Sequence, residues 1–351
     1  RSAWNSGREA NGAAAAPIRR RATRRDADRR RGAAPAPPRP AAGLARRTPS
    51  AILGASMVRA LHFTDVHVVA PYSGIPLRDW LGKRLLGGAN ALLRRNRRFA
   101  DAVHKLGRLA DFVREERVDL VLCTGDYTTL GTEAEYAVAR AAVAPLLAAP
   151  LGYVHVPGNH DLYLGDTVRE RRFERAFAGT LASDFPEHRV DGTWPIVRLV
   201  GDEVAVIAVS SARPNPQPWR SSGRVPDAEL SALARVLRDP RLTGRFVFVL
   251  LHYAPRRPSG EPDRYLHGLE NADELLTVCR SIERGAILHG HLHHCFELTL
   301  PGLTARIFDA GSTTYAGREG LWVFDVERDG AEVTRGRWDG ERYVLDRATT
   351  H

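Results

Sequence analysis

The chain has 351 residues, of which 43% are hydrophobic, and this is enough to form a large buried core. No apolar run reaches the roughly 18 residues that a membrane-spanning helix needs. The formal net charge of +10 arises entirely within residues 1–56, which hold 13 arginines and three acidic residues. Residues 57–351 carry no net charge, which argues against a folded domain that binds nucleic acid through a basic surface.

Residues 1–56 are rich in Arg, Ala and Pro and poor in the aromatic and β-branched residues that would offset the entropy of ordering. We therefore predict a disordered extension. Met57 is the only methionine of the chain, which makes it a candidate start of the native protein. Two interpretations of the extension stay open: an over-extended translation of GC-rich sequence, or a basic arm that contacts nucleic acid or anionic lipid.

From residue 57 onward, short apolar runs alternate with helical patterns. The predicted strands cover 58–64, 118–124, 152–156, 203–210, 245–251 and 285–289, and the predicted helices cover about 97–116, 132–149, 167–178, 226–238 and 270–283. After residue 294 the pattern contains strands alone, separated by glycine-containing turns. This order predicts one layered α/β domain over 57–351, with sheets packed together inside and helices outside.

A polar motif directly follows each of five predicted strands. The five motifs are Asp65-Val66-His67, Gly125-Asp126, Gly158-Asn159-His160-Asp161, His252 and Gly290-His291-Leu292-His293. Ligand sites of α/β proteins collect beyond the carboxyl ends of strands, so we expect these side chains to meet. Carboxylates, imidazoles and one amide, without thiolate, form a donor set that suits Mn, Fe, Zn, Co or Ni. Two such ions about 4 Å apart would need a carboxylate that binds both.

The ordered set DVH, GD, GNHD, H and GHLH resembles the motifs of the calcineurin-like metallophosphoesterase superfamily, in its bacterial phosphodiesterase and pyrophosphohydrolase branch. The resemblance covers residues 58 to about 312. It implies a four-layer α-β-β-α sandwich of two facing mixed sheets flanked by helices, and two divalent metal ions. The implied ligands are Asp65, His67, Asp126 and His293 for one metal, and Asp126, Asn159, His252 and His291 for the other.

The resemblance also implies the roles of two further residues. His160 would contact the phosphate or protonate the leaving oxygen, and Asp161 would orient His160. The implied reaction is hydrolysis of a phosphodiester or pyrophosphate bond in a small phosphorylated substrate by a hydroxide that bridges the two metals. His252 is assigned only because it follows a strand. Tyr127 is expected to pack in the core, and His294 to point away from the site because neighbouring strand residues face opposite ways.

Residues 71–98 form an insertion with seven basic residues, one acidic residue and several leucines. Two interpretations stay open. The insertion is either a structural cap with a solvated basic face, or a lid that clasps a lipid-linked phosphate and lies against an anionic membrane through residues 78–98. The second interpretation resembles the helical inserts of the UDP-diacylglucosamine pyrophosphohydrolases.

Two other classes of function are less well supported. A non-catalytic scaffold, such as the retromer subunit with this fold, is expected to lack the catalytic histidine, yet His160 is present. A nuclease of the recombination-repair type is expected to carry DNA-binding or coiled-coil regions, and the sequence contains no heptad segment.

The three cysteines, Cys123, Cys279 and Cys295, are odd in number and match no Cys-x-x-Cys spacing. They predict reduced and mostly buried thiols. Reduced thiols are typical of a cytoplasmic protein, and we predict this location. If the insertion is a lid, we also predict peripheral contact with a membrane.

Overall fold

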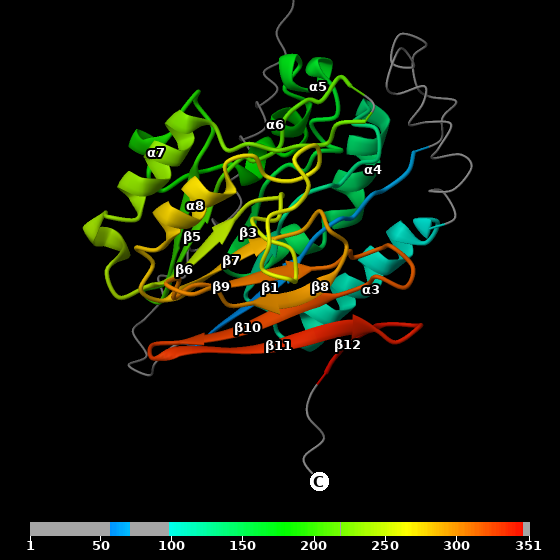
Figure 1. Cartoon of the computed structure of the whole chain (residues 1–351). Helices are drawn as coiled ribbons and strands as arrows, with labels where there is room; N and C mark the ends of the chain where they lie inside the picture. The colour runs from blue at the N-terminus through cyan, green and yellow to red at the C-terminus, as the bar shows by residue number, and fades with distance from the viewer. Residues whose placement is uncertain (1–56, 71–97, 218, 347–351) are drawn as a thin grey trace, which may run out of the picture. The chain divides into compact units, whose positions relative to one another are not determined.

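The computed structural model describes residues 57–70, 98–217 and 219–346 (Figure 1). The predicted extension over 1–56, and residues 71–97 of the predicted insertion, lie outside the described residues. Among the helices of the described ranges, none is long and apolar enough to cross a membrane. All three cysteines are buried free thiols, as the sequence predicts.

The first sheet has the strand order β12-β11-β10-β1-β2-β3. Its strands are β1 (Val58–Phe63), β2 (Leu120–Cys123), β3 (Gly152–His155), β10 (Leu321–Glu327), β11 (Gly330–Trp338) and β12 (Tyr343–Leu345). β1, β2 and β3 are parallel, so their carboxyl ends share one edge of the sheet. β10 pairs antiparallel with β1, which makes the sheet mixed.

The second sheet has the order β4-β5-β6-β7-β9-β8. Its strands are β4 (Ile196–Val200), β5 (Val204–Ala208), β6 (Phe246–Leu250), β7 (Gly285–His289), β8 (Cys295–Leu298) and β9 (Arg306–Ala310). β5, β6, β7 and β9 are parallel, and β4 and β8 are antiparallel edge strands. The parallel strands β5 and β6 are buried along their whole length, as expected for strands covered on both faces.

Helices cover the outer faces of the two sheets. The helices are α3 (Ala102–Glu115), α4 (Glu133–Val143), α5 (Gly165–Arg169), α6 (Arg172–Ala176), α7 (Asp227–Val236) and α8 (Ala272–Cys279). α7 and α8 lie together beside the second sheet, and α3 and α4 lie beside the first (Figure 1). α4 begins with a capping box, in which Thr132 accepts from the Glu135 N–H and Glu135 accepts from the Thr132 N–H.

The inner faces of the sheets pack on each other through aromatic side chains. The ring of Phe324 on β10 lies 5.2 Å from the ring of Phe248 on β6 and 5.0 Å from that of Phe308 on β9, measured between centroids. Both contacts are edge-to-face, the geometry that aromatic quadrupoles favour. The four-layer α-β-β-α prediction is therefore confirmed.

The structure differs from the sequence-based prediction at two places. β4 was not predicted, because it is a short edge strand that carries the half-exposed Arg198 and shows no long apolar run. The helix predicted over 167–178 is instead two short helices, α5 and α6. Arg171 has a φ of 49° between them, and the buried side chain of Arg172 turns inward to donate to the Gly131 carbonyl at 2.9 Å. Anchoring this guanidinium inside the protein breaks the helix.

A buried carboxyl group links α7 to the end of the second sheet. Glu229 is buried, and its Oε1 accepts the Ser210 N–H at 2.6 Å. Burial raises the pKa of Glu229 to about 8, because the charged form loses its hydration. The folded protein therefore holds a proton on Glu229 at pH values where the unfolded chain has released it.

Because of this proton, we expect the stability of the folded protein to decrease as the pH rises. A group whose pKa is higher in the folded state contributes its full stabilisation of the folded protein below its pKa in the unfolded chain, which is 4.5 for Glu229. This contribution is lost as the pH rises through the folded-state pKa of about 8. Glu229→Gln cannot ionise, so its free energy of unfolding should exceed that of the parent by on the order of a few kcal/mol at pH 8.5, and by much less at pH 4.5. Urea unfolding at both values measures this. Asp227→Asn, an exposed change on the same helix, is the control, and an equal effect of both substitutions at both pH values would contradict the prediction.

Candidate metal centre

The five motif loops meet at one edge of the two sheets and are joined by backbone hydrogen bonds. The Asp65 N–H donates to the Gly125 carbonyl at 2.9 Å, and the His67 N–H donates to the Asp126 carbonyl at 2.8 Å. In the second sheet, the Gly290 N–H donates to the His252 carbonyl at 3.0 Å. Side chains that are far apart in the sequence are thus fixed to rigid neighbouring strand ends.

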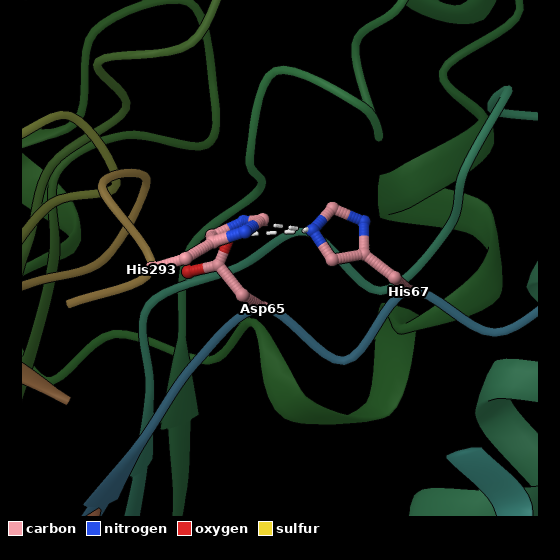
Figure 2. Close-up of side chains that lie close together, drawn as sticks. All are labelled: Asp65, His67 and His293. Atoms are coloured by element: carbon pink, nitrogen blue, oxygen red, sulfur yellow. Dashed lines mark hydrogen bonds and ion pairs between the residues drawn. The ribbon is translucent and has the colours of Figure 1, made fainter. Parts of the chain in front are cut away.

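A first cluster contains Asp65, His67 and His293 (Figure 2). Asp65 Oδ1 lies 2.8 Å from His293 Nε2 and 3.3 Å from His67 Nε2, and the two Nε2 atoms are 3.2 Å apart. His67 Nδ1 lies 3.2 Å from the Thr128 carbonyl, which can only accept, so the ring proton sits on Nδ1. In the neutral ring, the Nε2 lone pair therefore points at the carboxylate oxygen, which is itself an acceptor.

His252 belongs to a second cluster, and its rear nitrogen is held by a backbone carbonyl, as in His67. Its Nδ1 donates to the Thr124 carbonyl at 2.8 Å, which leaves the Nε2 lone pair of the neutral ring facing inward. That Nε2 is 2.9 Å from Asn159 Oδ1 and 3.4 Å from Asp126 Oδ2. The structure thus brings His252, the least supported of the predicted ligands, into the site.

His291 completes the second cluster. Its Nε2 donates to the His267 carbonyl at 3.1 Å, so the Nδ1 lone pair faces Asn159 Oδ1 at 3.0 Å. The His291 N–H donates to Asp65 Oδ2 at 3.0 Å, which ties this cluster to the first. In both clusters the rear nitrogen of a histidine is held by a backbone carbonyl, the usual arrangement behind a metal-binding imidazole.

One oxygen of Asp126 faces both clusters. Asp126 Oδ2 lies 3.4 Å from His252 Nε2 and 3.7 Å from His67 Nε2, whereas Oδ1 accepts the His160 N–H at 2.7 Å. This position is the one that a carboxylate shared by two metals would occupy. All seven predicted ligands therefore lie together, and their individual roles as ligands stay predictions.

The chemistry of these groups fits divalent cations. Carboxylate oxygens and an amide oxygen face inward, and so do the imidazole lone pairs of His67, His252 and His291 when these rings are neutral. Cations satisfy such a set of acceptors, and buried charges are stable only when paired in this way. The absence of thiolate agrees with the metals proposed from the sequence.

The electrostatics of the site favour ionised carboxylates. Burial alone would raise the pKa of Asp65, but His293 and His67 hold it well below its ordinary value. Burial would likewise raise the pKa of Asp126, but the neighbouring His252 keeps this pKa below its ordinary value. Burial would lower the pKa of His252, yet Asp126 raises it to about 9. A metal that binds His252 must therefore displace a proton, so metal affinity should increase with pH.

The backbone of the site is in an unfavourable conformation. Five of the seven predicted ligands have a positive φ, between 45° and 74°, which residues other than glycine rarely adopt. These residues are Asp65, His67, Asp126, His291 and His293. Such strain persists only where the surrounding structure enforces it, and it concentrates at functional sites.

His160 lies beside Asp126, and Asp161, which was predicted to orient His160, contacts neighbouring backbone amides. His160 Nδ1 lies 2.6 Å from the Thr129 carbonyl, which fixes the ring from behind. Asp161 instead accepts the N–H groups of Gly158, Tyr127 and Thr128, at 2.9 to 3.2 Å. It therefore joins the loops after β2 and β3, and it positions His160 through the backbone.

Several neighbours of the site carried no sequence signal. Phe99 packs on the ring of His67 at 4.7 Å, and Tyr315 packs edge-on against His293 at 5.5 Å. Tyr163 stacks on His160 at 5.6 Å. Tyr163 and Tyr315 come from loops without periodicity, whereas Phe99 belongs to the segment predicted as a helix and precedes α3. Only their contacts in space show that the three residues lie beside the site. As predicted, Tyr127 is buried; its hydroxyl is hydrogen-bonded in the core.

Comparisons with known proteins show which family the sequence resembles. The family model described as calcineurin-like phosphoesterase matches residues 58–295. A cAMP/cGMP dual specificity phosphodiesterase of Mycobacterium tuberculosis is 29% identical over 259 residues, covering 73% of this chain and 67% of that protein. A 3′,5′-cyclic adenosine monophosphate phosphodiesterase of Pseudomonas aeruginosa is 31% identical over 201 residues, covering 56% and 63%. The chain thus spans about two thirds of the length of these relatives.

A solved structure supports the fold. The crystal structure of a dimetal phosphatase from Danio rerio is similar with a TM-score of 0.53 and 16% identity, over 79% of this chain and 98% of that one. At this identity the likeness concerns the fold alone.

The glycines of the motifs are expected to be essential for the geometry of the site. A Cβ on Gly158 would lie 2.0 Å from Asp126 Oδ1, so Gly158→Ala must displace the shared carboxylate. We expect this variant to lose bound metal and about 1–3 kcal/mol of the free energy of unfolding. Metal content and urea unfolding measure the two effects. Gly165→Ala, where an added Cβ meets no atom within 4 Å, is the control. A Gly158→Ala protein with the metal content of the parent would refute the packing argument.

Proposed function

We propose that this chain, which belongs to the calcineurin-like phosphoesterase family, binds two divalent metal ions and hydrolyses cyclic nucleotides. Family membership and the phosphodiesterase relatives make it a metal-dependent phosphoric ester hydrolase. The observation that carries the dinuclear proposal is the single oxygen, Asp126 Oδ2, that faces both histidine clusters. The printed names of the two relatives support a cyclic nucleotide as substrate.

The proposed ligands divide between the two clusters. Asp65, His67 and His293 would hold one ion, Asn159, His252 and His291 the other, and Asp126 both. When bound, the two cations supply Lewis acidity, which activates water and neutralises charge on the phosphate. The protein contributes by holding each ligand in place before the substrate arrives.

His160 is proposed to act on the departing oxygen. The Thr129 carbonyl accepts the proton of Nδ1, so Nε2 is the nitrogen proposed to act on the substrate. The candidate ligand atoms of His160, His67 and Asp126 lie within 4.8 Å of one another, which supports the proposal that the His160 ring acts on the phosphate. A protonated His160 donates from Nε2 to the leaving oxygen, and the stacked ring of Tyr163 restricts its movement.

The other proposals from the sequence are less well supported. Hydrolysis of a lipid-linked pyrophosphate, with peripheral membrane contact, depended on the insertion 71–98, of which residues 71–97 lie outside the described structure. A non-catalytic scaffold does not require the aligned His160 or the shared Asp126. A cytoplasmic location and the identity of the metals stay predictions.

The proposed substrate can be tested with purified, metal-loaded protein. The panel contains 3′,5′-cAMP, 3′,5′-cGMP, bis-p-nitrophenyl phosphate, UDP-diacylglucosamine and single-stranded DNA, each with Mn²⁺ and with Zn²⁺. We expect the highest kcat/KM for a cyclic nucleotide and no turnover after treatment with a chelator. A higher kcat/KM for UDP-diacylglucosamine or DNA would overturn the proposed substrate but leave the metal-dependent hydrolase intact.

Two substitutions separate metal binding from proton transfer. Asp126→Asn should lose bound metal, because an amide carries no charge to offset the two cations, and it should lose turnover with it. His160→Ala should keep its metal and lose kcat by about 10²–10⁴-fold, the usual contribution of a positioned acid. Elemental analysis and cAMP hydrolysis measure both effects.

The matched controls lie away from the site. Asp119→Asn changes the carboxylate at the opposite end of β2, and His104→Ala changes an exposed histidine on α3. Both should keep metal and activity. A full metal complement in Asp126→Asn would rule out the shared-carboxylate assignment.

A further inference from the structure

A cavity of about 630 Å³ lies next to the metal centre and takes no part in the assignments above. Its lining includes Trp219, Arg257, Arg264, Tyr265, His267 and Leu292. Binding sites for small molecules commonly have volumes between about 300 and 1,000 Å³, so a nucleoside fits. The lining combines aromatic faces with guanidinium groups, and none of its residues is among the proposed metal ligands.

The cavity adjoins the centre through two of its lining residues. Leu292 lies in the chain between His291 and His293. The ring of His267 packs at a tilt against the ring of His291, with centroids 4.4 Å apart, and the His267 carbonyl accepts from His291 Nε2 at 3.1 Å. A molecule whose phosphate sits at the metal centre can therefore extend its remaining part into this cavity.

Two aromatic side chains of the cavity are unusually exposed. Trp219 is 73% exposed and Tyr265 is 76% exposed, although large apolar side chains are normally covered. The guanidinium carbon of Arg220 lies 6.0 Å from the centre of the Tyr265 ring, which restrains that ring from one side. Exposed aromatic faces are the surfaces on which nucleobases stack.

The loops that carry these rings are joined to each other. Trp219 lies between β5 and α7, and Tyr265 lies between β6 and α8. The Ser221 N–H donates to the Leu266 carbonyl at 2.8 Å, and the Gly223 N–H donates to the Gly268 carbonyl at 3.1 Å. The two aromatic residues therefore belong to one backbone platform, formed before a ligand binds.

We propose that Trp219 and Tyr265 form the subsite for the base of a nucleotide substrate, next to the phosphate at the metal centre. This inference rests on the proposed function and names how the same site selects its substrate. Arg257 and Arg264 line the same cavity and supply donors for the acceptors on the edge of a base. The base contributes binding energy there, and the phosphate reacts at the centre.

The test compares two substrates that differ only in the base: 3′,5′-cAMP and the abasic ribose 3′,5′-cyclic phosphate. We expect Trp219→Ala and Tyr265→Ala to raise KM for cAMP by about tenfold each, because each removes a stacking surface, and to change kcat by less than twofold. Neither variant should alter kcat/KM for the abasic substrate. Trp219→Phe and Tyr265→Phe keep a ring and should restore most of the affinity.

Leu151→Ala is the matched control, because Leu151 is an exposed apolar residue that precedes β3, at the opposite end of that strand from the centre. It should leave both substrates unaffected. A parent-like KM for cAMP in both alanine variants would overturn the base subsite while the proposed function stands. An equal loss on both substrates would also overturn it, since that result means damage to the centre. Failure of the parent protein to hydrolyse any cyclic nucleotide would overturn the proposed substrate and this inference together.

Discussion

The site depends on backbone carbonyls that hold the rear nitrogens of its histidines. A carbonyl can only accept, so it takes the ring proton and turns the lone pair of the other nitrogen toward the centre. The carbonyls that do this belong to Thr124, Thr128, Thr129 and His267. The resulting group of inward-facing acceptors repels itself unless cations or protons lie among them. Metal binding and the stability of these loops are thus linked.

The fold meets this requirement through rigidity. The ligands Asp65, Asp126 and His291 adopt positive φ, and neighbouring glycines allow the motif loops to approach closely. A Cβ at Gly290 would lie 2.1 Å from Thr64 Oγ1 and 2.4 Å from Asp65 Oδ2, just as one at Gly158 would collide with Asp126. The two sheets supply the stiffness, because the strands that carry these loops are paired along their length and share one aromatic core.

The sequence predicted which residues meet at the centre, because they follow strands with strong apolar patterns and sit in short motifs. It predicted less where tertiary contacts determine the ends of a helix or the partner of a side chain. The inward turn of Arg172 broke a periodic helix, and Asp161 was expected on a histidine ring but accepts loop amides. Trp219 and Tyr265 lie in loops without periodicity, so only the pairing of their backbones places them beside the centre.

The chemistry and the proposed recognition of substrate meet at His267. Its carbonyl fixes the tautomer of His291, while its ring lines the cavity and its Nδ1 lies 2.7 Å from Asp263 Oδ2. A molecule that fills the cavity would therefore contact the residue that orients a proposed metal ligand. The loop between β6 and α8 holds Tyr265 as well, so the proposed recognition of the base and the orientation of His291 would share one segment of backbone. If the proposed base subsite is correct, substrates that lack a base leave this contact unused, and the contact would distinguish nucleotides from simpler phosphodiesters.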